Sequence, residues 1–404
     1  MPLNNDERRL AALIATWRDR LVDDLRLFVG IPTGLDHRAG LDRMRSLLCQ
    51  RLTRLGATVE TIPAGSRPTW LHGSPVAGMG PPTAIARRWS PRPGATRILL
   101  SGHLDTVHDP DPDHPFRELV IAPDGRTATG PGCVDMKGGL VIACAALEAL
   151  HECGMDACWS FILNSDEETG SYWSEGALRS AAREHQVGLV FEPALPDGSL
   201  VTRRPGSGQF MVEARGRSAH VGRDFASGVS AVNALAGAVL RLSEFVDLAS
   251  GRIVNVGPVV GGHATNVVPD LARAWGNVRF PDAAAGEDLE RMIRSVETPE
   301  ISCPSIRIET SFNRPAKEAT PAVMALAEAA RSVAHDLGQS MTFGSTGGVC
   351  DGNILQAEGL PVIDTLGVRG GGLHTPQEWI DLSSLVDRCA LTAILMARLW
   401  HSGI

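Results

Sequence analysis

Short apolar segments of strand length alternate with amphipathic helical segments along much of this chain. Residues 96–101, 159–164 and 188–191 are apolar runs, and apolar residues recur at helical spacing over about 136–153 and 173–185. Similar patterns predict helices at 6–28, 38–55, 320–337, 351–358 and 382–400 and strands at 57–62, 83–89 and 362–366. This alternation predicts an α/β fold with a largely parallel sheet and helices on both of its faces.

The pattern changes near residue 206. From there the sequence predicts a strand at 209–214, a helix at about 226–247, strands at 252–260 and 270–280, a helix at 286–297 and a strand at 305–311. This β-α-β-β-α-β order is ferredoxin-like. A chain of 404 residues is also long for a single core. We therefore expect a catalytic domain formed by residues 1–205 and 316–404, with an inserted α+β domain at 206–315.

The composition is that of an ordinary globular protein, with 43% hydrophobic and 21% charged residues. A net charge of −8 without any Lys/Arg run argues against a nucleic-acid partner. No stretch of about 18 uncharged apolar residues predicts a membrane span. The first residues lack the features of a secretory signal, and the eight cysteines include no Cys-x-x-Cys pair. Reduced thiols in a cytosolic protein are the expectation.

Acidic residues and histidines follow the predicted strands or lie in glycine-rich turns. They are His103, Asp105, Asp135, Glu167, Glu168, Glu192 and His374. Ligand sites in open α/β sheets lie at the carboxyl ends of the strands, so these side chains are placed where a site is expected. Two imidazoles and several carboxylates suit a pair of divalent metals, most plausibly zinc. A remaining carboxylate can act as a base on metal-bound water, which is chemistry for amide or peptide hydrolysis.

Each of these residues also has a plainer interpretation when taken alone. His103 followed by Asp105 is compatible with a strand-end histidine held by a local carboxylate. Asp135 is well placed to cap the helix that follows it. Glu167 and Glu168 are compatible with a solvated acidic loop. Their order along the chain and their shared position at strand ends favour a common site.

Several motifs together resemble those of one enzyme family. They are His103-Leu-Asp-Thr-Val, Asp135-Met-Lys-Gly-Gly, Asp166-Glu-Glu-Thr-Gly-Ser, Phe191-Glu-Pro and His374-Thr. The set resembles the co-catalytic zinc exopeptidase and amidohydrolase family of glutamate carboxypeptidase, acetylornithine deacetylase, succinyl-diaminopimelate desuccinylase and aminoacylase. The resemblance extends over nearly the whole chain. Glu192, Asp351-Gly-Asn and residues 367–374 are most similar to the glutamate carboxypeptidase branch.

The resemblance implies two zinc ions per subunit, with cobalt or manganese as candidate substitutes. The implied ligands are His103, Asp135 and Glu192 for one ion and Asp135, Glu168 and His374 for the other. Glu167 would be the general base, and Asp105 would orient His103. The resemblance also implies a cis peptide bond after Asp135.

The inserted domain resembles the lid and dimerisation domain of the same family. In Ser218-Ala-His-Val-Gly, His220 would reach the active site of a neighbouring subunit and stabilise the oxyanion. A loop histidine at a helix start is the plainer alternative. Asn266 and Arg314 match positions that contact the substrate carboxylate, and a guanidinium suits such a contact because it binds a carboxylate bidentately.

Two features depart from the family pattern. Many relatives have Arg-Lys-Gly where this chain has Arg204-Pro205-Gly206, so Arg203 or Arg204 would have to replace a lysine that contacts substrate. The Gly/Pro-rich segment 64–82 has no family counterpart that we can place. Both departures concern the choice of substrate more than the chemistry.

The sequence therefore predicts a cytosolic, homodimeric di-zinc hydrolase. It would cleave the amide bond of an N-acyl amino acid or small peptide by metal-activated water, as a glutamate carboxypeptidase does. One alternative is an N-acyl amino acid deacylase of the acetylornithine deacetylase or desuccinylase type. A more distant alternative is a metal-binding module without catalytic activity.

Overall fold

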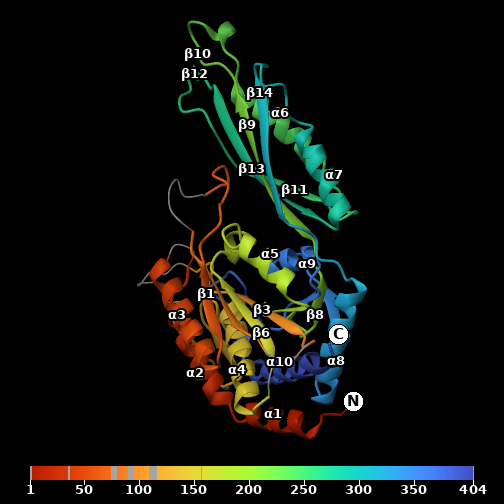
Figure 1. The fold of residues 1–404 in the computed structure, drawn as a ribbon. Helices are drawn as coiled ribbons and strands as arrows, with labels where there is room; N and C mark the ends of the chain where they lie inside the picture. The colour runs from red at the N-terminus through yellow and green to blue at the C-terminus, as the bar shows by residue number, and fades with distance from the viewer. Residues whose placement is uncertain are drawn as a thin grey trace.

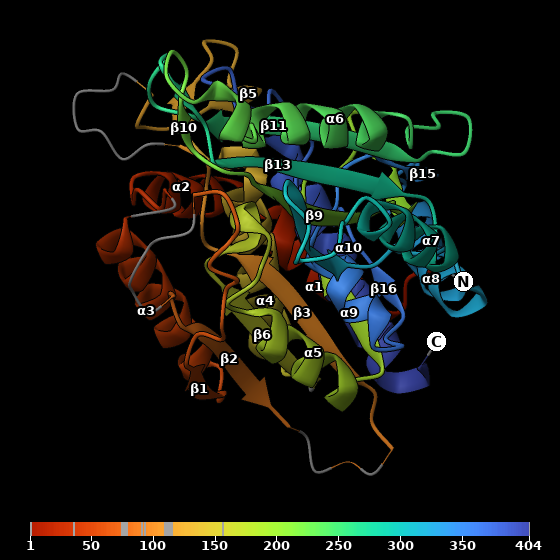
Figure 2. The same cartoon turned by 90° about the horizontal axis from the view of Figure 1, so that it is seen from above.

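The computed structural model describes residues 2–34, 37–73, 80–89, 92, 94–108, 116–155 and 157–403. Figure 1 shows a larger α/β body that contains both chain ends and a smaller body joined to it through two chain crossings. Seen from above in Figure 2, the strands and helices of the smaller body lie over the larger one. The predicted α/β class is confirmed by this architecture.

The larger body is built on a six-stranded sheet with the order β1-β2-β6-β3-β7-β16. Its strands are β1 (Thr58–Ile62), β2 (Thr83–Arg88), β3 (Arg97–His103), β6 (Cys158–Asn164), β7 (Val187–Val190) and β16 (Val362–Ile363). Strands β6, β3, β7 and β16 are parallel to one another, whereas β2 is antiparallel to β6 and β1 to β2. The carboxyl ends of β3, β6 and β7 therefore meet at one edge of the sheet.

Helices cover both faces of this sheet. One face packs against α3 (Arg38–Arg54), α4 (Gly138–Glu152), α8 (Pro321–Asp336) and α10 (Ser383–Ser402). Helices α1 (Asn5–Ala15) and α2 (Arg18–Val29) pack against α4 and α10 and share the same core. The other face packs against α5 (Glu175–Glu184) and α9 (Asp351–Ala357). Because side chains alternate along a strand, Ile98 and Leu100 of β3 enter the first core and Leu99 enters the second.

The helix expected over residues 6–28 is in fact two helices, so this prediction was wrong in part. Helix α1 ends at Ala15, and the Thr16 hydroxyl donates to the carbonyl of Leu13 at 2.7 Å. Helix α2 begins at Arg18. Buried Leu10, Ile14, Trp17 and Leu21 keep helical spacing across the break, which is why the apolar pattern did not reveal it.

The smaller body contains the predicted β-α-β-β-α-β order. Its elements are β9 (Gly206–Arg215), α6 (Ala231–Ser243), β11 (Ile253–Gly261), β13 (Leu271–Phe280), α7 (Ala283–Arg294) and β14 (Ser305–Arg314). The strands form an antiparallel sheet with the order β11-β13-β9-β14 and have a core of their own. Helix α6 is shorter than the expected 226–247. Ser230 caps its start at Ala231 by accepting from the N–H of Asn233, and the helix ends at Ser243. The separate core supports the predicted boundaries at 206 and 315, which remain a prediction.

Short strands complete the structure. They are β4 (Val120–Ile121), β5 (Thr127–Thr129), β8 (Leu200–Arg203), β10 (Ala219–His220), β12 (Val267–Val268), β15 (Phe343–Ser345), β17 (Gly370–Gly371) and β18 (Trp379–Asp381). The sheet β17-β18-β5-β4 lies beside the metal-binding candidates, and β10 pairs with β12 at the far end of the smaller body (Figure 1). No described helix combines the length and the apolar character that a membrane crossing needs.

The Gly/Pro-rich segment 64–82 is described except for residues 74–79. The N–H of Gly65 donates to the carbonyl of Trp173 at 2.7 Å, and the Arg67 guanidinium lies 5.3 Å from the centre of the Trp173 ring. The carbonyl of Trp70 accepts from the indole N–H of Trp275 on β13 at 2.6 Å. The described part of this segment therefore contacts both the acidic loop after β6 and the sheet of the smaller body.

Candidate metal centre

The acidic residues and histidines predicted from the sequence converge at the carboxyl ends of three parallel strands. His103 is the last residue of β3, Glu167 begins a short 3-10 helix (Glu167–Thr169) after β6, and Glu192 follows β7. Asp135 lies in the turn Cys133–Lys137 before α4, where its own backbone is not helical (φ −117°, ψ 96°). His374 lies in the loop between β17 and β18. The peptide bond between Asp135 and Met136 is cis, as the resemblance implied.

Two groups of potential metal ligands share Asp135. The first is His103, Asp135 and Glu192, the second is Asp135, Glu168 and His374, and the ligand atoms within each group all lie within 4.8 Å of one another. The two oxygens of Asp135 face different groups: Oδ1 lies 3.2 Å from Nε2 of His103, and Oδ2 lies 3.5 Å from Nε2 of His374. A carboxylate in this position can bridge two metal ions.

Tight packing of glycine brings the loop of Asp135 next to Glu192. A Cβ atom on Gly139 would lie only 2.1 Å from the carbonyl oxygen of Phe191, so only glycine permits this approach. In the second ligand group, His374 has a φ of 62°, in the left-handed region that non-glycine residues rarely adopt. Its ring is thereby held 3.3 Å from Oε2 of Glu168.

The ionisable side chains of the two ligand groups have an electrostatic environment that suits divalent cations. Burial raises the pKa of Glu192 well above its ordinary value, and burial also raises the pKa of Glu168. Hydrogen bonds to Asp135 and Glu168 raise the pKa of His374 to about 10. Oε1 of Glu168 is buried without a hydrogen-bond partner among the described residues. Nitrogen and carboxylate donors around a surplus of buried negative charge suit two divalent cations.

Asp105 supports the site in two ways. Nδ1 of His103 lies 3.0 Å from the carbonyl oxygen of Asp105 and 3.5 Å from its carboxylate. The same carboxylate accepts hydrogen bonds from the N–H groups of Glu167 at 3.3 Å and Glu168 at 3.0 Å. Asp105 therefore joins the histidine at the end of β3 to the acidic loop after β6, which is more than the orienting role expected from the sequence.

Glu167 belongs to neither ligand group. Its side chain is buried, and burial raises its pKa to about 8 in spite of the nearby Arg314. The Arg314 guanidinium lies 2.7 Å from Oε1 of Glu167 and donates to the carbonyl of the same residue at 2.8 Å. The residue expected to bind a substrate carboxylate is thus placed against the expected base.

Comparison with known proteins identifies the family. Residues 99–398 match the sequence model of Peptidase family M20/M25/M40. The chain belongs to the M20 family. Its members are hydrolases that act on amide bonds.

The match to relatives extends over most of the chain. It is 27% identical to carboxypeptidase G2 of Pseudomonas sp. (strain RS-16), over 93% of this chain and 88% of the relative. It is also 27% identical to succinyl-diaminopimelate desuccinylase of Granulibacter bethesdensis, over 88% of this chain and 91% of the relative.

Solved structures share the fold. A tripeptidase of Staphylococcus aureus superposes with a TM-score of 0.74 at 21% identity, over 94% of this chain and 99% of the other. A dinuclear metal-binding M20 peptidase of Bacillus subtilis superposes with a TM-score of 0.65 at 15% identity, over 96% of this chain and 99% of the other.

Two predicted site residues of this M20 chain lie far from the metal-ligand groups. His220 on β10 and Asn266 before β12 are both exposed at the outer end of the smaller body (Figure 1). The ring of His220 accepts from the N–H of Gly222 at 3.1 Å. Neither residue contributes to the site of its own chain in this structure, so their predicted roles depend on a second subunit.

Arg204, predicted to contact substrate, is bound to other groups of the protein. Its guanidinium is buried and donates to both oxygens of Asp364, at 2.9 and 3.0 Å, and to the carbonyl of Gly348 at 3.0 Å. These contacts use all three nitrogens of the guanidinium. Arg204 therefore has a structural role that the sequence did not indicate, and its predicted contact with substrate stays a prediction.

Sequence reasoning missed Glu378. Its carboxylate is fully buried and accepts from the N–H groups of Gly132 at 2.8 Å, Val134 at 2.8 Å and Asp135 at 3.0 Å. Nε2 of His108 lies 2.6 Å from the same carboxylate. No motif signals this role, because the partners are backbone groups of a loop that is remote in the sequence.

Replacing Glu378 with glutamine should weaken metal binding. The side-chain amide would place N–H groups where the loop of Asp135 needs an acceptor, so this loop would loosen. The loop of His374, which lies four residues before Glu378, would loosen with it. We expect the dissociation constant for metal to rise by about 10–100-fold. Titration of the metal-free protein against a competing chelator measures it, with Glu118→Gln, an exposed acid, as the control. An unchanged constant would show that Glu378 does not support the ligands.

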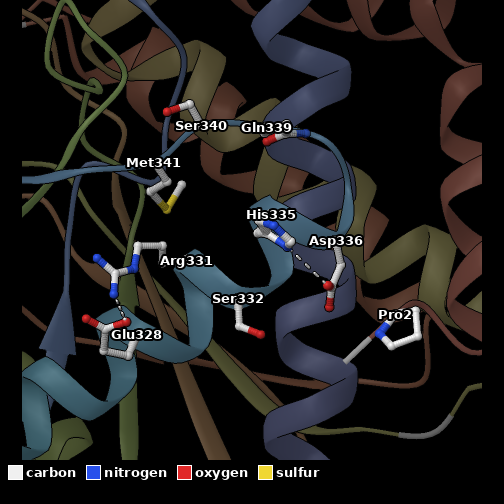
Figure 3. Close-up of a pocket in the computed structure, with 9 residues that line it drawn as sticks. All are labelled: Pro2, Glu328, Arg331, Ser332, His335, Asp336, Gln339, Ser340 and Met341. Atoms are coloured by element: carbon white, nitrogen blue, oxygen red, sulfur yellow. Dashed lines mark ion pairs between the residues drawn. The ribbon is translucent and has the colours of Figure 1, made fainter.

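A surface hollow elsewhere on the molecule lacks comparable chemistry. It measures about 660 Å³ and is lined by α8 and the segment after it (Figure 3). Its charged side chains are engaged in ion pairs, with Arg331 lying 2.6 Å from Glu328 and His335 lying 3.6 Å from Asp336. None of the predicted site residues lines it. The cluster at the carboxyl ends of the strands therefore remains the candidate site.

Proposed function

We propose that this M20 enzyme hydrolyses the amide bond of an N-acyl amino acid or small peptide with a free carboxylate, in the manner of a carboxypeptidase. The observation that carries the proposal is the pair of ligand groups sharing Asp135, with Glu167 beside them and outside both. The relatives named as a carboxypeptidase and a desuccinylase agree with amide cleavage and leave the acyl group open.

The ligand assignments implied by the sequence fit this proposal. His103, Asp135 and Glu192 would hold one zinc ion, and Asp135, Glu168 and His374 would hold the other. Metal held by these residues would supply a Lewis acid for the amide carbonyl and would lower the pKa of bound water, so that hydroxide is available at neutral pH. Asp105 and Glu378 hold the loops that bear these ligands.

Glu167 is proposed as the general base. Its carboxylate would accept a proton from the attacking water and deliver it to the departing amine, so that the side chain is regenerated with each turnover. Arg314 lies 2.7 Å from this carboxylate. In this proposal the guanidinium orients Glu167 and would also meet the carboxylate of the substrate.

We propose a homodimer formed through the smaller body. Strand β11 is at the edge of its sheet, and Leu240, Val259 and Val260 on α6 and β11 are 67%, 58% and 51% exposed. An open strand edge beside apolar side chains suits pairing with a second copy. The second copy would also bring its own His220 and Asn266 to the metal-binding candidates of the first chain. Sedimentation velocity tests this proposal: a fully active single chain would contradict it.

The choice between carboxypeptidase and deacylase depends on the leaving amino acid. We expect hydrolysis of N-acyl amino acids and dipeptides to fall at least tenfold when the carboxylate of the leaving residue is amidated, because Arg314 would lose its partner. Equal rates would favour the deacylase. A protein that binds zinc and hydrolyses none of these compounds, before or after removal and return of the metal, would instead be an inactive binding module.

The cytosolic location also remains a proposal. All eight cysteines are free, and five of them are buried. Secretion of the protein with intact function would contradict it.

A further inference from the structure

The two chain crossings between the bodies meet at one buried side chain. The amide Nδ2 of Asn353 donates to the carbonyl of Pro205 at 3.0 Å and to the carbonyl of Pro315 at 2.8 Å. Its Oδ1 accepts from the N–H of Cys350 at 3.0 Å. Asn353 is fully buried in the first turn of α9. One side chain therefore ties the outgoing and the returning chain to the same point of the catalytic domain.

Proline explains why a side chain is needed there. Proline has no N–H group, so the chain cannot be tied through the backbone nitrogens of Pro205 and Pro315. The hydrogen bonds of both carbonyls are partly buried, and a carbonyl shielded from water requires a donor. A primary amide has two N–H groups and can serve one carbonyl on each crossing. Alanine at position 353 would leave both carbonyls without this donor.

A second set of contacts holds the crossings on the catalytic side. The backbones of Arg204 and Lys317 exchange two hydrogen bonds, at 2.9 and 3.0 Å. Their side chains converge on Asp364, which receives two hydrogen bonds from Arg204 and lies 3.4 Å from Nζ of Lys317. These residues fix where the crossings begin. Asn353 holds Pro205, one residue further toward the smaller body on the outgoing chain, and Pro315, two residues further on the returning chain.

The turn that holds the crossings also holds the acidic loop. Asp351, two residues before Asn353, accepts from the hydroxyl of Ser171 and from Nδ2 of Asn164 at 2.8 Å. Arg314 directly precedes Pro315 and donates to Ser171 Oγ at 2.8 Å while it lies against Glu167. A change in the angle of the crossings would therefore move Arg314 relative to Glu167.

We propose that Asn353 is a positioning residue that sets the angle of the smaller body and, through Arg314, the placement of Glu167. The effect of Asn353 on catalysis rests on the proposed role of Glu167. Its effect on the angle between the two bodies is independent of the proposed function. Asp351-Gly-Asn, singled out in the sequence without an assigned function, thereby receives one.

The angle is tested by a distance between the two bodies. Spin labels on the exposed native Cys303 and on His335→Cys would report it by double electron–electron resonance, with half-buried Cys49 and Cys153 replaced by serine. We expect a narrow distribution for the parent and a broader or shifted one for Asn353→Ala. Asn353→Asp keeps the size but lacks the donors, and it should behave likewise if the alanine variant does not fold. Gln356→Ala, which removes a hydrogen bond to Glu318 from the same helix, is the control and should match the parent.

Kinetics separate the two parts of the proposal. We expect kcat of Asn353→Ala to fall by about 10–100-fold with metal content unchanged, because small misplacements of catalytic groups have effects of this size. An unaltered distance distribution in folded Asn353 variants would overturn the positioning role. A broadened distribution with normal kcat would overturn the link to Glu167. If the parent showed no amide hydrolysis, the proposed function would fail while the distances still decided the role of Asn353.

Discussion

Glu167→Gln should leave both metal ions bound and lower kcat by about 10²–10⁴-fold, the usual contribution of a general base. Glutamine has the shape of glutamate and leaves the hydrogen bond from Arg314 to the backbone carbonyl of residue 167 in place, but it cannot take a proton from water. Glu167 lies outside both ligand groups, so metal content should not change. Metal analysis together with steady-state kinetics measures both quantities.

Glu168→Gln is the matched comparison, because it alters the adjacent acid. Glu168 lies within the second ligand group, 3.3 Å from His374. We expect this variant to lose metal, and its activity should recover in part when metal is added in excess. Near-normal turnover of Glu167→Gln at saturating substrate would show that another group is the base.

Asp364→Ala should lower the free energy of unfolding by about 3–5 kcal/mol, the usual effect of removing one partner from a buried ion pair. Asp364 is fully buried and is bound by Arg204 and Lys317, both also buried. Its removal would leave two positive charges without a counter-charge. Urea unfolding followed by fluorescence measures the change. Asp288→Ala, which removes a half-exposed acid beside Arg291, is the control and should cost at most about 1 kcal/mol.

The same variant has a predictable pH dependence. Burial raises the pKa of Asp364, but the charges of Arg204 and Lys317 outweigh it and hold the pKa below its ordinary value of 3.8. A carboxyl group with a lowered pKa stabilises the folded state above its unfolded pKa, and this contribution is lost as the pH falls through the folded pKa. The difference between the parent and Asp364→Ala should therefore shrink below about pH 4. A constant difference down to pH 2 would contradict this assignment.

The sequence predicted those features that follow from local pattern. Strand-helix alternation predicted the parallel strands, and the acids after β3, β6 and β7 were predicted to meet because parallel strands end at the same edge. The ferredoxin-like element order was likewise readable from residues 206 to 314. The roles of these residues in catalysis are proposals that await the experiments above.

Other features depend on contacts between remote segments, which no local pattern reveals. Glu378 binds backbone N–H groups more than 240 residues away in the sequence, at Gly132, Val134 and Asp135. Arg204 was predicted to contact substrate because Arg204-Pro205-Gly206 stands where many relatives have Arg-Lys-Gly. Its partner in the structure is Asp364, which belongs to none of the motifs seen in the sequence. The break after Ala15 was hidden because the apolar spacing continues through it.

The bridge between Arg204 and Lys317 means that the chain leaves the catalytic domain and returns to it at adjacent positions. A turn of a few residues could join these two points without displacing either. The smaller body is thus a module whose presence does not interrupt the path of the surrounding chain. In descent, such a module can be exchanged or reshaped while the framework that holds the metal ligands stays the same. The residues of the smaller body can then diverge independently of those that form the candidate metal centre.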